Sequence, residues 1–344
     1  MGSRPSTWSC LQHRPADNRQ NDLTAIRALI ADGVFPGVSS LLLPMVDNLG
    51  FDLSIANSPD EVRQALPNVH LLVVKNLPLG ADDIEAAQQL RGVQKLGRLV
   101  DSIDIDALKR KGIPFRTMGL PSAVAVADHT LALMLALSRQ LILASVAMKV
   151  PSSVEEIRTD ERHFAYNWAG LPTSSLAGKS LGLIGFGEVA LEVAVRAQAF
   201  GMQVEYTKRV PLPVATERRL KVRFTTFDSL LKESDVVSVH VPHTSETVGL
   251  IGADELGSMK PGALLINTAR GAIVDEKALV DSLISGHLGG AGLDVFTIEP
   301  LPQNSPLLTA PHTVLTPHMA GAGSQALAQA IALSLARWKS ALKT

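Results

Sequence analysis

The chain has 344 residues, which predicts two or three domains at about 150 residues each. Its 32 Lys and Arg residues nearly balance 33 Asp and Glu residues. The resulting net charge of −1 argues against a nucleic-acid-binding protein, because affinity for phosphates needs a basic excess. Apolar residues make up 46% and aromatic residues only 4%, so the core is built from Ala, Val, Ile and Leu. Such a core suits helices packed on a parallel sheet, and an α/β protein is expected.

Composition also restricts the compartment. The single cysteine, Cys10, excludes an intrachain disulfide and a multi-cysteine metal site, and no other spacing predicts a bound metal. The most apolar stretch, 131–148, contains Arg139 and Gln140 near its middle, which favours a buried helix over a membrane span. The N-terminus lacks the apolar run of a signal peptide, and residues 1–20 are predicted to be a loose tail. We expect a cytoplasmic protein with no membrane partner.

The first third of the chain alternates strand-like and helix-like segments. Ser58 before Pro59 is typical of a helix N-cap, and a helix at Asp104–Lys111 should end at Gly112. The region before residue 51 is rich in Gly and Pro, and Val38–Leu43 is its candidate strand. The other predicted strands are Phe51–Ala56, His70–Lys75 and Ile113–Thr117. Repeated units of this size indicate parallel pairing with right-handed crossovers.

The second half gives a clearer pattern. A single long helix is predicted from Ala123 to Ala147, because this stretch has neither Gly nor Pro, and it should connect two α/β halves. A last helix is predicted from Ser324 to Leu342, with either half as its packing partner. The strands expected between them are Leu181–Ile184, Gln203–Tyr206, Val236–Val241, Ala263–Ala269, Gly290–Phe296 and Thr313–Thr316.

Residues 185–190 carry the pattern G-x-G-x-x-A between an apolar strand and a helix. Gly185 permits the tight turn, Gly187 allows the backbone to approach a pyrophosphate, and Ala190 permits close packing of helix on strand. The N–H groups that begin the helix would face the phosphates. A purely structural glycine turn is the alternative, but the strand before and the helix after favour a dinucleotide site.

The end of the next strand bears on the choice of dinucleotide. An acid about 20 residues after the glycines would bind the adenosine ribose of NAD. Thr207 stands there, followed by Lys208 and Arg209, which suits the 2′-phosphate of NADP. The alternative is that Glu205 binds the ribose and the two cations are merely solvated. We expect NADP(H) in preference to NAD(H).

Three further segments, 266–271, 292–300 and 315–320, follow predicted strands, at the edge where open α/β sheets place their sites. Together they supply a guanidinium, carboxylates and an imidazole. A guanidinium can bind the carboxylate and carbonyl of a 2-oxo acid. An imidazolium can deliver a proton to the carbonyl oxygen, and a carboxylate on its far nitrogen can orient it. Reduction of a 2-oxo acid needs these three groups beside a hydride carrier.

These motifs resemble the D-isomer-specific 2-hydroxyacid dehydrogenase family, which includes glyoxylate/hydroxypyruvate reductases and D-lactate, formate, phosphite and D-3-phosphoglycerate dehydrogenases. The resemblance runs from about Leu90 to Gly323 and rests on motifs in the expected order. They are the glycine pattern, Val126-Ala127, Asp128-His129-Thr130, Val241-Pro242, Met259-Lys260-Pro261-Gly262, Asn267–Gly271, Asp294, Glu299-Pro300-Leu301-Pro302 and Pro317-His318.

The family's fold consists of two Rossmann-like domains with parallel sheets, usually in a homodimer. The resemblance therefore implies a cofactor domain at 123–318, inserted into a flavodoxin-like substrate domain at 1–122 and 319–344. The active site is expected in the cleft between the two domains.

Site roles follow from the same resemblance. Arg270 is expected to bind substrate, Glu299 to partner the histidine, and His318 to act as acid/base. The residues expected beside the dinucleotide are Gly185, Gly187, Glu188, Val189, Thr207, Lys208, Arg209, Val241, Pro242, Thr268, Ala269 and Asp294. For two further histidines simpler roles are favoured: His129 opens a helix and should cap or pack, and His243 should lie in a loop.

The chain departs from the family in the substrate-domain loop, which normally reads small-Val-Gly-x-Asp and binds the substrate carboxylate through N–H groups. Arg98 replaces the valine and Leu99 the glycine. If Leu99 cannot adopt the glycine's backbone angles, carboxylate binding must differ. Arg98 is then either an additional anion contact or a solvent-facing side chain. A second departure is Asp128 in place of the family's glutamate.

The sequence thus predicts an NAD(P)-dependent oxidoreductase that interconverts a small 2-oxo acid and its D-2-hydroxy acid. One alternative is a family member that acts on another small anion, suggested by Arg98 and Leu99. The other is a dinucleotide-sensing corepressor, which an intact set of Arg270, Glu299 and His318 argues against.

Overall fold

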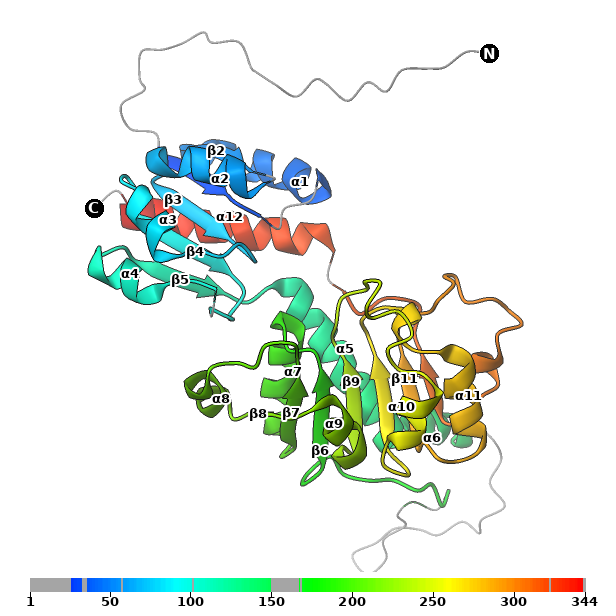
Figure 1. Ribbon diagram of the computed structural model, residues 1–344. Coiled ribbons are helices and arrows are strands. Elements are labelled where there is room, and N and C mark those ends of the chain that lie inside the picture. The colour runs from blue at the N-terminus through cyan, green and yellow to red at the C-terminus, as the bar shows by residue number, and fades with distance from the viewer. Residues whose placement is uncertain are drawn as a thin grey trace, which may run out of the picture.

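The computed structural model describes residues 26–32, 36–56, 58–100, 102–149, 167, 169–321 and 323–342. It contains two α/β units, each built on a parallel sheet, and this confirms the predicted fold class. Figure 1 shows the two units side by side, with helix α5 between them and the last helix, α12, along the first sheet. The predicted tail at 1–20 lies outside the described residues.

The first unit has five strands in the order β2-β1-β3-β4-β5, the flavodoxin-like arrangement. Its strands are β1 (Ile26–Ile30), β2 (Phe51–Ile55), β3 (Leu71–Val74), β4 (Gly92–Leu96) and β5 (Phe115–Met118). Its helices are α1 (Pro36–Val46), α2 (Pro59–Ala65), α3 (Ala81–Ala86) and α4 (Ile105–Arg110). Helices α1 and α12 cover one face of the sheet, and α2 to α4 cover the other.

The second unit has seven strands in the order β12-β11-β10-β9-β6-β7-β8. They are β6 (Ser180–Ile184), β7 (Gln203–Thr207), β8 (Arg223–Phe224), β9 (Val236–Val239), β10 (Leu264–Asn267), β11 (Gly290–Leu293) and β12 (Thr313–Leu315). The helices are α7 (Glu188–Ala199), α8 (Val214–Leu220), α9 (Phe227–Glu233), α10 (Ala253–Ser258) and α11 (Glu276–Ile284). The strand order reverses between β6 and β9, which is where such sheets bind ligands.

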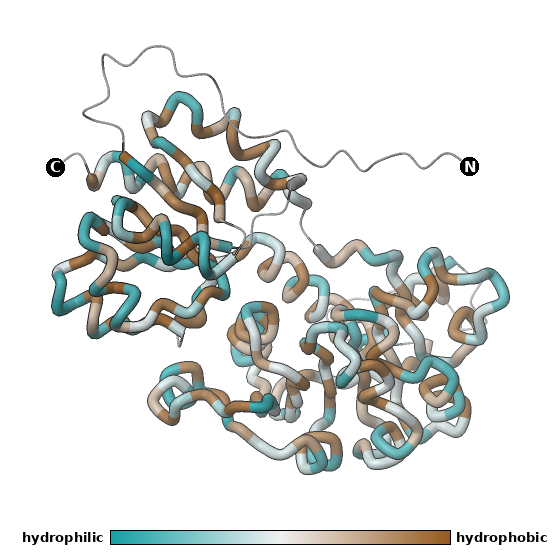
Figure 2. Tube along the Cα trace, turned by 45° about the horizontal axis from the view of Figure 1, so that its top comes forward, coloured by the Kyte–Doolittle hydropathy of each residue, from teal (hydrophilic) through white to brown (hydrophobic). Residues whose placement is uncertain are grey.

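Hydrophobic residues fill the interior of both units. Figure 2 shows hydrophobic segments, in brown, along the chain trace of each unit. Helices α5 and α7 cover one face of the second sheet, and α9, α10 and α11 cover the other. The core is aliphatic, as the composition predicts, and Tyr206 and Phe186 are among its few aromatic residues.

The predicted long connector is two helices. Helix α5 (Pro121–Ser138) ends before Arg139, and α6 (Leu141–Ala147) begins after Gln140, whose φ of +53° is left-handed and stops the helix. Helix α5 is the one helix in the described ranges long and apolar enough to cross a membrane by length and composition alone. It packs against α7 and the strands β10 to β12, which supports the buried-helix interpretation.

Helix α12 (Ser324–Leu342) begins and ends where the sequence predicts, and it packs on the first unit. Ser334 and Trp338 donate hydrogen bonds of 2.7 and 2.9 Å to the buried Gln94 side chain of β4. The chain therefore leaves the first unit through α5 and returns to it at its end. The exact domain limits, at 122–123 and 318–319, stay a prediction.

Three predictions of secondary structure are wrong. Val38–Leu43 lies inside α1, where Val38 and Leu42 are buried four residues apart on one helix face. Strands β1, β4 and β8 are absent from the predicted set. The sequence pattern does not reveal strand β4, because the strand contains the charged residue Lys95, which is buried instead of exposed. The predicted strands after residue 235 are too long at their carboxyl ends, because those residues form the site loops.

Candidate active site

The imidazole and one carboxylate of the predicted set form a pair. His318 follows β12, Glu299 follows β11, and His318 Nδ1 lies 2.6 Å from Glu299 Oε2. Partial burial opposes ionisation of Glu299, but the hydrogen bonds from His318 and from the Phe296 N–H outweigh it and hold the pKa of Glu299 below its usual value. An ionised carboxylate here fixes the ring orientation of His318 and leaves Nε2 for a substrate.

Arg270 lies in the same cavity. It follows β10 and, with His318 and Glu299, lines a cavity of about 360 Å³. The Arg270 carbonyl accepts a hydrogen bond from Asn267 Nδ2, which shapes the turn that presents the guanidinium. His243 also lines this cavity, so its loop position, as predicted, faces the candidate site. The three predicted catalytic residues are thus brought together by the ends of three adjacent strands.

Gly271 makes that arrangement possible. A Cβ at this position would lie 1.9 Å from the backbone carbon of Phe296, so only glycine lets the loop after β10 pass the loop after β11. The close approach brings Arg270 and Glu299 to one cavity. A second cavity, of about 500 Å³, adjoins it and is lined by Phe296, Leu301 and Leu315 together with His318.

Asp294 anchors the catalytic turn, and its place beside the dinucleotide stays a prediction. Its carboxylate is buried and accepts hydrogen bonds from Thr316 Oγ1 at 2.6 Å and from the N–H groups of Met319 and Ala320. It therefore fixes the turn that carries His318. His129 Nε2 lies 2.8 Å from Thr316 Oγ1, so the predicted packing role of His129 includes a contact with this turn.

The glycine turn fits a dinucleotide. Gly185 has a φ of +90°, and a Cβ there would lie 2.6 Å from the carbonyl oxygen of His240. A Cβ at Gly187 would stand in open space, so a ligand can approach the backbone. Helix α7 begins at Glu188, and its first N–H groups have no partner within the helix. Gly185, Gly187 and this helix start would hold the pyrophosphate, and the bound dinucleotide would supply or accept hydride.

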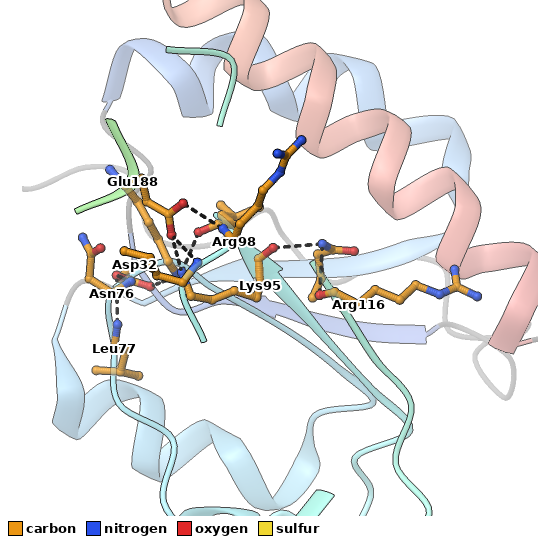
Figure 3. Close-up of polar contacts among 11 residues, drawn as sticks. Asp32, Asn76, Leu77, Lys95, Arg98, Arg116 and Glu188 are labelled. Atoms are coloured by element: carbon orange, nitrogen blue, oxygen red, sulfur yellow. Dashed lines mark hydrogen bonds and ion pairs between the residues drawn. The ribbon is translucent and has the colours of Figure 1, made fainter. Parts of the chain in front are cut away.

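The Glu188 side chain does not lie with its backbone beside this turn. Its carboxylate reaches the first unit, where Arg98 N donates to Oε2 at 2.8 Å and Leu99 N donates to Oε1 at 3.0 Å. Lys95 Nζ lies 3.4 Å from Oε1 (Figure 3). The prediction that Glu188 contacts the dinucleotide is therefore limited to its backbone.

The loop that departs from the family pattern keeps its N–H donors. Leu99 is absent from the described residues with positive φ, whereas Gly97 has a φ of +111°. Leu99 therefore does not need the glycine's backbone angles. The N–H groups of Arg98 and Leu99 both donate to a carboxylate, which is that of Glu188. The Arg98 guanidinium lies 3.3 Å from Glu192 Oε1 on α7 and is half exposed. The structure thus pairs Arg98 with an acid of α7, and its contact with an anionic ligand stays a prediction.

The candidate 2′-phosphate residues lie at the end of β7. Thr207 ends the strand, and Lys208 and Arg209 follow it, with Arg209 Nη1 lying 3.5 Å from the exposed Glu246. Glu205, the alternative ribose ligand, pairs with Arg223 of β8.

The other residues expected beside the dinucleotide differ in how far their side chains are exposed. The Thr268 side chain is buried, and its hydroxyl lies 3.0 Å from Thr130 Oγ1 of α5, so only its backbone is available. Val189 packs between the two units, and Ala269 and Val241 pack on the second core. Pro242 is exposed. Burial lowers the pKa of the neighbouring His240 to about 3, so that ring is neutral.

Sequence reasoning missed two groups near the loops of the first sheet. Lys95 is buried at the end of β4, and Asp32, after β1, accepts hydrogen bonds from the N–H groups of residues 75–77 (Figure 3). A charged residue inside an apolar strand pattern was the available signal for Lys95. Among the described residues, no three His, Cys, Asp or Glu side chains are placed to hold a metal ion.

Comparison with known proteins agrees with this geometry. Residues 131–320 match the family described as D-isomer specific 2-hydroxyacid dehydrogenase, NAD binding domain. The chain belongs to this family. It is 37% identical to the hydroxypyruvate reductase of Thermotoga maritima over 78% of this chain and 83% of that protein. A solved structure of a Thermus thermophilus protein covers 90% of this chain and 94% of its own, with 33% identity and a TM-score of 0.53.

D-3-phosphoglycerate dehydrogenases are also similar to the chain. That of Archaeoglobus fulgidus is 36% identical over 81% of this chain, but the match spans only 51% of that longer protein. The chain thus corresponds to about half of these relatives.

Proposed function

We propose that the protein reduces a small 2-oxo acid to its D-2-hydroxy acid with a nicotinamide dinucleotide. The observation that carries the proposal is the pair of His318 and Glu299 at 2.6 Å, in one cavity with Arg270. Arg270 would bind the substrate and stabilise negative charge on the carbonyl oxygen. His318 Nε2 would donate the proton to that oxygen, while Glu299 keeps the ring oriented. In the oxidative direction the same nitrogen takes the proton back.

The proposal includes NADP(H) in preference to NAD(H). Lys208 and Arg209 stand at the end of β7, where a 2′-phosphate would lie, and Glu205 is engaged with Arg223. Two cations without an acid at the end of this strand favour a phosphate over a ribose hydroxyl.

A homodimer in the cytoplasm completes the proposal. Helix α6 supports an interface between two copies, because its Leu141, Ile142, Leu143 and Val146 side chains are about half exposed. Light scattering on the purified protein measures the mass, and Ile142→Asp should shift it toward the monomer.

The test of the activity is direct. Purified protein is assayed for NADPH and NADH oxidation with glyoxylate, hydroxypyruvate, pyruvate and bulkier 2-oxo acids, and for oxidation of D-3-phosphoglycerate. We expect turnover with a small 2-oxo acid. Dinucleotide binding without turnover of any of these compounds would favour a sensor instead.

A further inference from the structure

The carboxylate of Glu188 occupies a site that is built for a carboxylate. Arg98 N donates to one oxygen at 2.8 Å, and Leu99 N donates to the other at 3.0 Å, with Lys95 Nζ at 3.4 Å from the latter. Two N–H groups and an ammonium thus converge on both oxygens of one acid. Gly97 leaves room for it, because a Cβ there would lie 2.0 Å from Glu188 Oε1.

Burial makes an anion necessary in this site. The Lys95 side chain is only 4% exposed, and within the described part of the chain Glu188 is the one carboxylate paired with it. The other partner of Lys95 Nζ is the neutral carbonyl of Leu96, at 2.8 Å. A buried ammonium without an anion is strongly destabilising, so the departure of Glu188 requires that another anion take its place.

Figure 3 shows two loops of the first unit whose N–H groups donate to a carboxylate, and the two carboxylates come from different parts of the chain. Asp32 and the loop at 75–77 belong to the same sheet, so that contact stays within one unit. Glu188 begins α7 of the second unit, whereas Lys95 and Arg98 belong to the first. The acid and the site thus belong to different units, and a change in their relative position would withdraw Glu188 and empty the site.

We propose that Glu188 is an internal competitor for the substrate. In the structure its carboxylate occupies the site formed by Lys95 Nζ and the N–H groups of Arg98 and Leu99, and the carboxylate of a 2-oxo acid binds there by replacing it. This inference rests on the proposed function. Lys95 is then a substrate-binding residue, and Glu188 raises the concentration of 2-oxo acid that the protein needs.

Calorimetric titration of the cofactor-free protein with oxamate tests the competition, since oxamate has the shape of a 2-oxo acid but is not reduced. We expect Glu188→Ala to bind oxamate at least about tenfold more tightly than the unaltered protein. Glu188→Gln, which keeps the size of the side chain but not its charge, should show a smaller gain. Asp281→Ala is the control, because Asp281 pairs with Lys277 on the surface of α11 and should leave oxamate affinity unchanged. Equal affinities for Glu188→Ala and the unaltered protein would overturn the proposal.

A second variant locates the bound oxamate. Adding Lys95→Met to Glu188→Ala should abolish the gain in affinity, because the ammonium is lost. If the double variant still binds tightly, oxamate lies elsewhere and the proposal is wrong. If Glu188→Ala fails to fold by circular dichroism, Glu188→Gln with and without Lys95→Met answers the same question. Turnover of 2-oxo acids is measured separately, so a protein that shows the competition but no turnover contradicts only the proposed activity.

Discussion

His318 and Glu299 lie 2.6 Å apart at the ends of two adjacent strands, in a cavity that also holds Arg270. His318 has a φ of +52°, a left-handed conformation that asparagine tolerates better than alanine does. We therefore choose His318→Asn as the test of acid/base catalysis. It should lower kcat by about 10²–10⁴-fold, the usual contribution of such a group. His312→Asn is the matched control, because His312 has a φ of +53° and lies outside the cavity. Near-normal kcat in His318→Asn would contradict the assignment.

Glu299 should contribute to stability in a pH-dependent way. Its pKa is lowered in the folded protein, so its contribution is complete above the usual value of 4.5 and is lost as pH falls through the lowered value. Thermal unfolding of the unaltered protein and of Glu299→Gln should differ by a constant amount between pH 6 and 4.5, and the difference should shrink below that. A difference that stays constant down to pH 3 would mean that the carboxylate is not stabilised by the pair.

The choice of dinucleotide can be tested with two pairs of cations. Replacement of Lys208 and Arg209 by alanine should raise KM for NADPH by about 10–100-fold, since hydrogen bonds to charged groups contribute about 1.5–3 kcal/mol. KM for NADH should change little. Arg218 and Arg219, exposed on α8, are the matched control for the loss of two positive charges. Equal losses for both dinucleotides would show that Lys208 and Arg209 are only solvated.

Thr316 joins His129 to Asp294 beneath the catalytic turn. Thr316→Val keeps the shape but removes the hydroxyl that donates to Asp294 at 2.6 Å, so a buried carboxylate loses a partner. The free energy of unfolding should fall by about 1–3 kcal/mol, and kcat should fall because the turn that carries His318 loosens. Thr313→Val, three residues earlier in β12, removes a longer, partly buried bond of 3.2 Å to the Ala310 carbonyl and serves as the control. Similar kcat values for the two variants would exclude this positioning role.

Helix α12 should contribute strongly to the stability of the first unit. Trp338 is 1% exposed, and Trp338→Ala should lower the free energy of unfolding by about 3–5 kcal/mol in chemical denaturation. Leu333→Ala, on the same helix but 55% exposed, should change it by less than about 0.5 kcal/mol. Comparable losses in the two variants would contradict the packing of α12 on β4.

The three proposed catalytic residues could be predicted because each lies in a short motif, and the motifs occur in a characteristic order along the chain. Each of Arg270, Glu299 and His318 follows a strand of one parallel sheet, so the strand pattern alone brings them to one edge. The glycine turn is equally local, because Gly185 and Gly187 act through their own backbone. The ends of α12 were also predictable, since the Gly-rich stretch before Ser324 separates it from the last strand.

Contacts between distant segments could not be predicted from local patterns. The direction of the Glu188 side chain depends on Lys95 and Gly97, about 90 residues earlier, and no local rule links them. Asp294 has the same limitation: its motif marks a site residue, but only the fold shows that its carboxylate binds the turn at 316–320. The prediction of one continuous helix through Gln140 was wrong for another reason. A residue other than Gly in a left-handed conformation cannot be recognised from composition.

The placement of α12 has a consequence for synthesis of the chain. Gln94 of β4 is made long before its hydrogen-bond partners Ser334 and Trp338. At about 5–20 residues per second, the roughly 240 residues in between take about 12–48 s. During this interval one face of the first sheet is covered by α1 alone, and all the strands of the second sheet are made before α12. The first unit is therefore completed only after the second sheet has been made, and until then its partly covered sheet is exposed to aggregation and to chaperones.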